Sequence, residues 1–217
     1  MKEVLVKTGM KNEYDIAKAH FDPASVILTG IQTVADLEKN VPSYVRKIIS
    51  FGMNGGLRPE APIVGQTIIC SHLVGPDGIY YPDQHWNHQI FLKTKYFEAP
   101  IYSDGNFNES NTPAQRAKLY EHTHCWAMDD ESYFVAAFCK KHGLQWTAVR
   151  NASDAWNDDV SITSHLLNAQ GDVDIWAVIK AFTTDPEDML KIWKHYKTSE
   201  TQLGVLAVQL GKDLLAS

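Results

Sequence analysis

Two carboxylates that could act as an acid and a base lie in the middle of the chain, Glu131 and Asp154. Glu131 stands at the start of a predicted helix, and Asp154 stands just after a predicted apolar strand. In α/β proteins, residues that face ligands collect where strands reach their carboxyl edge and helices begin. The pattern therefore predicts both carboxylates at one rim of a sheet, although each could instead serve only as a helix-terminal charge or cap.

Two further segments follow predicted strands and could approach a ligand. The segment Gly52–Leu57 has the sequence GMNGGL, and glycines at a strand end let the backbone come close to a bound molecule. It does not match the glycine spacing of a dinucleotide site, so such a site is disfavoured. Glu13 opens a helix after the first strand, where it could do chemistry or only compensate the helix dipole.

Short β-branched runs and helical patterns alternate along the chain, which predicts an α/β fold. Strands are expected at Glu3–Thr8, Ser25–Thr29, Arg46–Phe51, Gly65–Val74, Ala99–Ser103, Cys125–Asp129 and Gln145–Ser153. Helices are expected at Gln32–Asn40, from Pro113 with Thr112 as N-cap, at Asp130–His142, 162–170 and 173–182, and from Pro186 to about Leu215. Gly75–His88 is predicted as a loop. Neither a linker nor a repeat interrupts the pattern, so residues 1–217 are expected to form a single domain.

The composition is that of an ordinary soluble protein, with 44% hydrophobic and 21% charged residues. A formal net charge of −6 argues against a general nucleic-acid binder. Cys70, Cys125 and Cys139 show no C-x-x-C spacing and are expected to be reduced thiols of a cytoplasmic protein. The sequence MKEVLVKTG predicts an early strand rather than a signal peptide, and we expect no membrane-spanning segment.

Two histidine pairs could suggest a metal site. His85 and His88 form one pair, and His122 and His124 form the other. Neither pair has the spacing of a zinc module, and the second lies at a helix end, where cationic side chains are favourable. We therefore expect no metal.

In their order and spacing, these segments resemble the purine nucleoside phosphorylase/uridine phosphorylase superfamily. Within it they look closest to the methylthioadenosine/S-adenosylhomocysteine nucleosidases and the hopanoid-associated phosphorylases. The likeness extends from the first strand to about Trp156 and rests on LTGI (Leu28–Ile31), FGMNGGL (Phe51–Leu57), VGQ (Val64–Gln66), D-x-E-S (Asp129–Ser132) and SDA (Ser153–Ala155). It implies a single domain with a mixed, twisted central β-sheet surrounded by helices and a helical C-terminal third.

The resemblance also implies an activity, cleavage of the N-glycosidic bond of a purine nucleoside of the adenine type. Asp154 resembles the acid at purine N7, Glu131 the carboxylate that holds ribose hydroxyls, and Glu13 the residue that positions the attacking water. Phe107 resembles an aromatic side chain that stacks on the base. The implied substrate-binding residues are Met53, Asn54, Gly55, Phe107, Asn108, Asp130 and Ser153.

Two positions depart from the family pattern. Asp130 stands where the family usually has a methionine under the sugar, and Met53 replaces a small hydroxyl residue. The identity of the substrate therefore stays open, and a sugar modified at its 5′ side is one option.

The acceptor of the sugar is either water or phosphate. Phosphorylases surround phosphate with cations, often arginine. Ser50 stands where hexameric phosphorylases of this family carry arginine, so hydrolysis is favoured, although Lys11 or Arg58 could supply a cation. The alternatives are a phosphorylase that releases ribose 1-phosphate and a non-catalytic nucleoside-binding relative.

No cofactor is expected, except phosphate as co-substrate of a phosphorylase. The expected partners are a small-molecule nucleoside and further copies of the chain, as a homodimer or larger homo-oligomer. The aromatic segment Gly75–His88 is the candidate contact between copies, and neither nucleic acid nor membrane is expected as a partner.

Overall fold

In a computed structural model the described residues are 3–21, 26–28, 30, 33–94, 96–105, 111–161 and 183–213. Within them, eight strands form one mixed sheet in the order β2-β1-β3-β7-β6-β4-β5, with β8 paired to both β3 and β4. The strands are β1 (Val4–Lys7), β2 (Val26–Leu28), β3 (Lys47–Gly56), β4 (Thr67–Gly75), β5 (Gly78–Tyr80), β6 (Phe97–Ser103), β7 (Ala127–Asp129) and β8 (Gln145–Asp154). The expected mixed central sheet is therefore confirmed.

Five of the strands form a closed ring of paired neighbours. Strand β3 pairs with β8, β8 with β4, β4 with β6, β6 with β7, and β7 again with β3. Strands β1, β3 and β8 are parallel neighbours. Their carboxyl ends therefore lie at the same edge, where α/β proteins hold their ligands.

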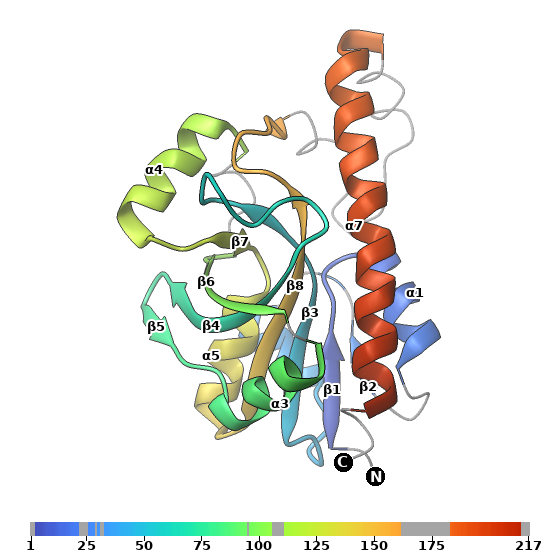
Figure 1. Cartoon of the computed structure of the whole chain (residues 1–217). Coiled ribbons are helices and arrows are strands. Elements are labelled where there is room, and N and C mark those ends of the chain that lie inside the picture. The colour runs from blue at the N-terminus through green and yellow to red at the C-terminus, as the bar shows by residue number, and fades with distance from the viewer. Residues whose placement is uncertain are drawn as a thin grey trace.

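Helices cover both faces of the sheet (Figure 1). On one face α1 (Lys11–His20), α3 (Gln84–Thr94) and the long α7 (Pro186–Asp213) pack on one hydrophobic core. On the other face α2 (Val34–Asn40) and α5 (Ser132–His142) pack on a second core. Because strand side chains alternate between faces, Val4 and Val6 of β1 join the first core and Leu5 joins the second.

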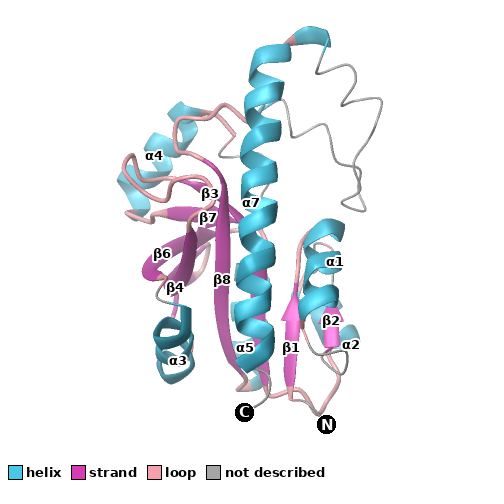
Figure 2. Ribbon diagram, turned by 45° about the vertical axis from the view of Figure 1, so that its right-hand side comes forward, coloured by secondary structure: helices cyan, strands magenta, loops and turns pink. Residues whose placement is uncertain are grey.

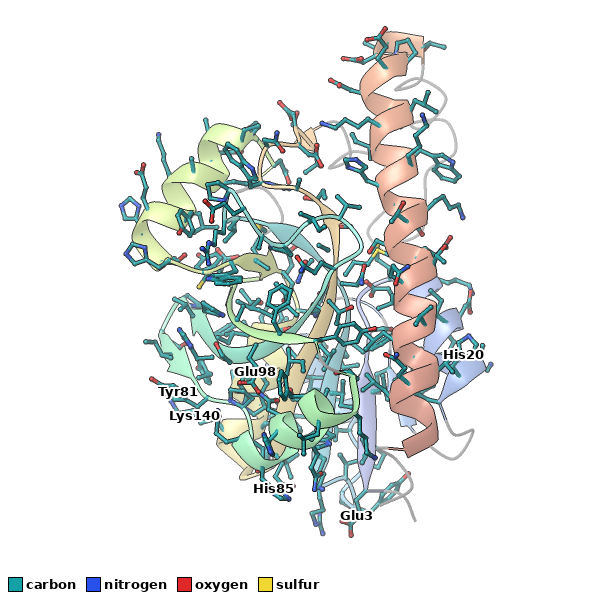
Figure 3. The ribbon with its side chains drawn as sticks, viewed as in Figure 1. Glu3, His20, Tyr81, His85, Glu98 and Lys140 are labelled. Atoms are coloured by element: carbon teal, nitrogen blue, oxygen red, sulfur yellow. The ribbon has the colours of Figure 1, made fainter. Side chains whose placement is uncertain are left out.

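Helix α7 runs along β8 with α1 at its side, as Figure 2 shows. At the end of α1, labelled His20 lies beside α7 (Figure 3). Its carbonyl oxygen faces Gly211 so closely that a Cβ at Gly211 would overlap it. This contact fixes the crossing of the two helices near the end of α7.

Helix α4 (Pro113–Thr123) has the termini that the sequence predicts. The Thr112 hydroxyl accepts a hydrogen bond from the Gln115 backbone N–H, and Pro113 occupies the first turn. Helix α5 ends at Gly143, whose φ of 66° is unfavourable for residues with a Cβ.

Two local predictions are wrong. The segment Gly75–His88 is not a loop, because it contains β5 and the start of α3. Its helix begins after Asp83, whose carboxylate accepts a hydrogen bond from the Trp86 backbone N–H at 2.8 Å. The strand expected at Arg46–Phe51 does not end there either, because β3 continues through the glycine segment to Gly56. The helices expected at 162–170 and 173–182 lie outside the described residues.

Across the described part of the chain, no helix has the length and apolar character needed to cross a membrane.

Candidate active site

Three carboxylates proposed from the sequence lie near the shared carboxyl edge of β1, β3 and β8. Glu13 reaches it from the first turn of α1, and Glu131 directly precedes α5. Asp154 is the last residue of β8. Two arginines that the sequence analysis did not single out, Arg150 and Arg116, organise this edge.

Glu13 is almost completely buried, with 2% of its surface exposed. One carboxylate oxygen accepts hydrogen bonds from the backbone N–H groups of Gly9 and Met10, at 2.8 and 2.9 Å. The other accepts from the Met53 N–H at 2.7 Å. Burial and, next, the charge of Glu131 raise the pKa of Glu13 to about 7, against the opposing effects of Arg150 and these N–H groups.

Arg150 lies at the centre of the buried charges. Its guanidinium contacts Glu131 at 2.9 Å, Asp129 at 3.1 Å and the Ser50 hydroxyl at 2.7 Å. Although burial opposes the charged form, the carboxylates of Asp129 and Glu131 raise the pKa of Arg150 above its ordinary value. A single arginine inside the apolar strand Gln145–Asp154 was the available sequence signal, because a charge there needs buried partners.

Asp129 holds the start of α5 in place. Its carboxylate accepts hydrogen bonds from the backbone N–H groups of Glu131 and Ser132 at 3.0 and 2.8 Å. It also accepts from the hydroxyls of Ser132 and Ser103 at 2.6 and 2.9 Å. Asp129 therefore positions Glu131, which explains why these residue types occur together in the segment Asp129–Ser132.

Glu131 lies across the turn between β1 and α1. A Cβ at Gly9 would overlap its carboxylate, so the side chain needs a glycine at that position. Its side chain is 11% exposed. Glu131 therefore lies between Arg150 on one side and the turn at Gly9 on the other, with limited access to solvent.

Asp154 lies at a second, separate group of polar contacts. The guanidinium of Arg116, from α4, forms an ion pair with one carboxylate oxygen. The Ser153 hydroxyl donates to the other oxygen at 2.5 Å. Arg116 also donates to the carbonyl of Ala155 at 2.7 Å, so it ties α4 to the end of β8.

The glycine-rich end of β3 lies between these two groups. A Cβ at Gly52 would lie 2.6 Å from both Glu13 and Arg150. A Cβ at Gly55 would lie 2.9 Å from the Asp154 carboxylate. The strand can pass between both charged groups only because these positions lack side chains.

Met53, Asn54 and Ser153, which the sequence analysis proposed as substrate-binding residues, have different surroundings. Met53 is buried in the core beneath α1 and α7, and offers its N–H to Glu13. The Ser153 hydroxyl also lies 3.0 Å from the Asn54 carbonyl. The Asn54 amide is buried, and neither its nitrogen nor its oxygen has a hydrogen-bond partner among the described residues.

Asp130 introduces a further carboxyl group beside Glu131. Burial, followed by the charges of Glu131 and Asp129, raises its pKa to about 8. One of its oxygens is buried without a hydrogen-bond partner in the described structure. At neutral pH Asp130 is therefore mostly a neutral acid that can donate a hydrogen bond.

Phe107 and Asn108 lie outside the described residues. The stacking of Phe107 on the base therefore stays a prediction. Within the described ranges, no group of three or more His, Cys, Asp or Glu side chains could hold a metal ion.

No protein-family model matches this chain, and no curated protein matches it in sequence. Its structure, however, is similar to solved nucleosidases. It matches the 5′-methylthioadenosine/S-adenosylhomocysteine nucleosidase of Neisseria meningitidis, in complex with methylthio-immucillin-A, with a TM-score of 0.69 and 12% identity over 96% of this chain and 98% of that one.

Two Helicobacter pylori proteins give similar results. The 5′-methylthioadenosine/S-adenosylhomocysteine nucleosidase matches with a TM-score of 0.65 and 14% identity, over 95% of this chain and 97% of that one. Futalosine hydrolase matches with a TM-score of 0.65 and 13% identity, over 94% and 97%. The chain therefore has the same fold as these solved enzymes.

Proposed function

We propose that the protein hydrolyses the N-glycosidic bond of a purine nucleoside of the adenine type. One observation carries the proposal: two buried carboxylates, Glu13 and Glu131, are organised around one arginine at the sheet edge where Asp154 ends β8. The nucleosidase fold supports the same reaction class, since the similar structures include enzymes named for nucleoside cleavage.

Each carboxylate has a role in this reaction. The C1′–N9 bond breaks with its electron pair leaving on the purine, while the water oxygen bonds to C1′. Glu13 accepts the proton of the water, and Asp154 in its protonated form transfers its proton to purine N7, so the protons balance. The carboxylate that this leaves is the form that pairs with Arg116 in the structure. Glu131 holds the ribose hydroxyls, and its negative charge favours the cationic sugar of the transition state.

The surroundings of Arg150, Lys11 and Arg58 favour water over phosphate as the acceptor. Arg150 lies beside Ser50, but its guanidinium already contacts the carboxylates of Asp129 and Glu131. It also donates hydrogen bonds to the hydroxyls of Ser50 and Ser132. Lys11 is exposed and pairs with Asp15 at 2.7 Å. The other candidate, Arg58, pairs with Glu60 and lies over the Trp126 ring. None of the three offers a site like the arginine clamp of a phosphorylase.

The unpartnered oxygen of Asp130 supports a substrate with a polar group near the sugar. A buried polar atom is usually hydrogen-bonded in native structures, so a ligand group is a suitable partner. This argument fits a ribose hydroxyl or a polar substituent on the 5′ side.

The decisive experiment follows base release from 5′-methylthioadenosine, adenosine and inosine by purified protein, with and without phosphate. We expect adenine and free sugar at the same rate in both conditions. Phosphate-dependent formation of a ribose 1-phosphate would replace the proposal with a phosphorylase. Binding of nucleosides without any turnover would instead identify a non-catalytic relative.

The variant Asp154→Asn tests the role at the base in the same assay. We expect kcat to fall by about 10²–10⁴ with little change in KM, the usual contribution of general-acid assistance. Asp159→Asn is the matched control, because Asp159 is exposed on the same segment. An unchanged kcat in Asp154→Asn would remove Asp154 from the mechanism.

A further inference from the structure

Lys7 is a buried cation beside the proposed site, and the mechanism above does not use it. It ends the otherwise apolar strand β1 and is 1% exposed. Its ammonium donates hydrogen bonds to the carbonyls of Thr8, at 2.6 Å, and Gly30. A buried lysine is costly unless charge or hydrogen bonds compensate it, so its place at this edge calls for a reason.

The register of the sheet places Lys7 next to the arginine network. Lys7 is paired with Ser50 in the parallel ladder of β1 and β3, so both side chains lie on the same face of the sheet. The Ser50 hydroxyl accepts the hydrogen bond of Arg150 and also contacts Ser132 at 2.9 Å. Two residues after Lys7, Gly9 makes the close approach to Glu131.

The charges around Lys7 come from four other elements. Glu131, Arg150, Glu13 and Asp129 interact with it, in decreasing order of strength, from the start of α5, β8, α1 and β7. Burial is the larger influence and lowers the pKa of Lys7 to about 8. Lys7 is therefore mainly charged at pH 7, and it interacts favourably with all three carboxylates.

The balance of charge at the site depends on this lysine. Lys7 and Arg150 are two cations facing the three carboxylates of Glu13, Asp129 and Glu131, which leaves an excess of one negative charge when all are ionised. Without Lys7 the excess would be two. The other titratable groups are Asp130, which is mainly neutral, and Tyr196 of α7, which interacts with Glu13.

We propose that Lys7 is a positioning residue of the reaction: its ammonium balances the buried carboxylates, so that Glu13 and Glu131 can be charged together while the sugar becomes cationic. This inference rests on the proposed function. It assigns to β1 an electrostatic role in addition to its place in the core. Lys7 acts through the two carboxylates and does not touch the reacting atoms.

The test is the pH profile of kcat/KM for the wild type and for Lys7→Met, which keeps the length and apolar stem of the side chain. We expect the acidic limb to move to higher pH by about one unit, because an opposite charge nearby typically shifts a carboxyl pKa by one unit or more. Activity at pH 7 should fall roughly 5- to 10-fold, and the profiles should converge above about pH 9, where Lys7 is also neutral. A loss of the same factor at every pH would contradict the proposal.

Lys39→Met is the matched control, since Lys39 is an exposed residue of α2. Its profile should coincide with that of the wild type. The double variant Lys7→Met/Glu13→Gln provides a second control. If Lys7 acts through Glu13, the shift seen in Lys7→Met should be lost when Glu13 cannot titrate.

A measurement without turnover separates this inference from the proposed function. Because the pKa of Glu13 is raised from 4.5 to about 7, its proton stabilises the fold at low pH, and this stabilisation is lost as pH rises to about 7. In Lys7→Met the loss should extend about one unit further, as measured by urea unfolding from pH 5 to 8.5. An unshifted curve overturns the role of Lys7, whereas a shifted curve with no base release from any nucleoside overturns only the proposed function.

Discussion

Glu13, at the start of α1, has surroundings that suit the role of base proposed for it. A carboxylate in the first turn is usually a solvated charge that compensates the helix dipole. Here three backbone N–H groups hold it in a buried site, and burial raises its pKa to about 7. A group with that pKa can accept a proton near neutral pH, which the reaction requires of the residue that positions water.

This pKa predicts the pH dependence of activity. Glu13 must be ionised to accept a proton, so kcat/KM should rise tenfold per pH unit below about 7 and level off above it. Glu13→Gln should lower kcat/KM at pH 8 by about 10²–10⁴, the contribution of a general base. Initial rates from pH 5 to 9 measure both effects.

The control for Glu13 lies on the same helix. Asp15 is half exposed and pairs with Lys11, so Asp15→Asn should keep the wild-type profile. An acidic limb retained in Glu13→Gln would assign the titration to another group, with Asp130 the next candidate because its pKa is also raised.

At the scale of elements, β3 is the clearest difference between expectation and structure. The strand expected from the sequence ends at Phe51, before the glycines of β3, because glycine weakens strands. In the structure they are strand positions where Glu13, Arg150 and Asp154 occupy the space of the missing side chains. Local composition cannot distinguish these cases, because the groups that fill the space come from α1 and β8.

The contact between α1 and α7 is testable with two glycines of the same helix. A Cβ at Gly211 would overlap the His20 carbonyl, so Gly211→Ala should lower the free energy of unfolding by about 1–3 kcal/mol, the usual cost of overpacking. A Cβ at Gly204 meets nothing within 4 Å. Gly204→Ala should therefore increase stability by about 0.5–1 kcal/mol, because alanine loses less backbone entropy in a helix.

Urea unfolding of the two variants measures the difference. A Cβ at either glycine would meet none of the proposed carboxylates, so kcat/KM at 25 °C should match the wild type. A Gly211→Ala variant as stable as Gly204→Ala would show that the crossing of α1 and α7 tolerates a side chain there.

At the scale of the whole molecule, the outer edge of β5 leaves apolar side chains exposed. Ile79 is 51% exposed and Tyr81 is 68% exposed. Figure 3 shows the labelled Tyr81 at the outer edge of the molecule. Neighbouring exposed apolar side chains are typical of surfaces that bind other proteins. They lie within Gly75–His88, the segment proposed from the sequence as the contact between copies.

The oligomeric state is therefore a prediction of its own. We expect light scattering coupled to size-exclusion chromatography to give a dimer or larger assembly for the wild type. The double variant Ile79→Lys/Tyr81→Lys should reduce the assembly to monomers, because buried unpaired charges oppose association. Val205→Lys, at an exposed position of α7, is the control and should leave the assembly intact. A monomeric wild type would contradict the prediction.

The sequence alone determined the alternation of elements, the α/β class and the carboxylates at element boundaries. These features depend on local signals, such as the cap at Thr112, the strand period and the position of Glu13 and Glu131 at helix starts. Only the tertiary structure decided which charges meet. Arg150 with Asp129 and Glu131, Arg116 with Asp154, and Lys7 beside Ser50 join residues that are distant in the chain. The effect of a buried charge depends on its neighbours and on the exclusion of water, and neither is a property of a local stretch of sequence.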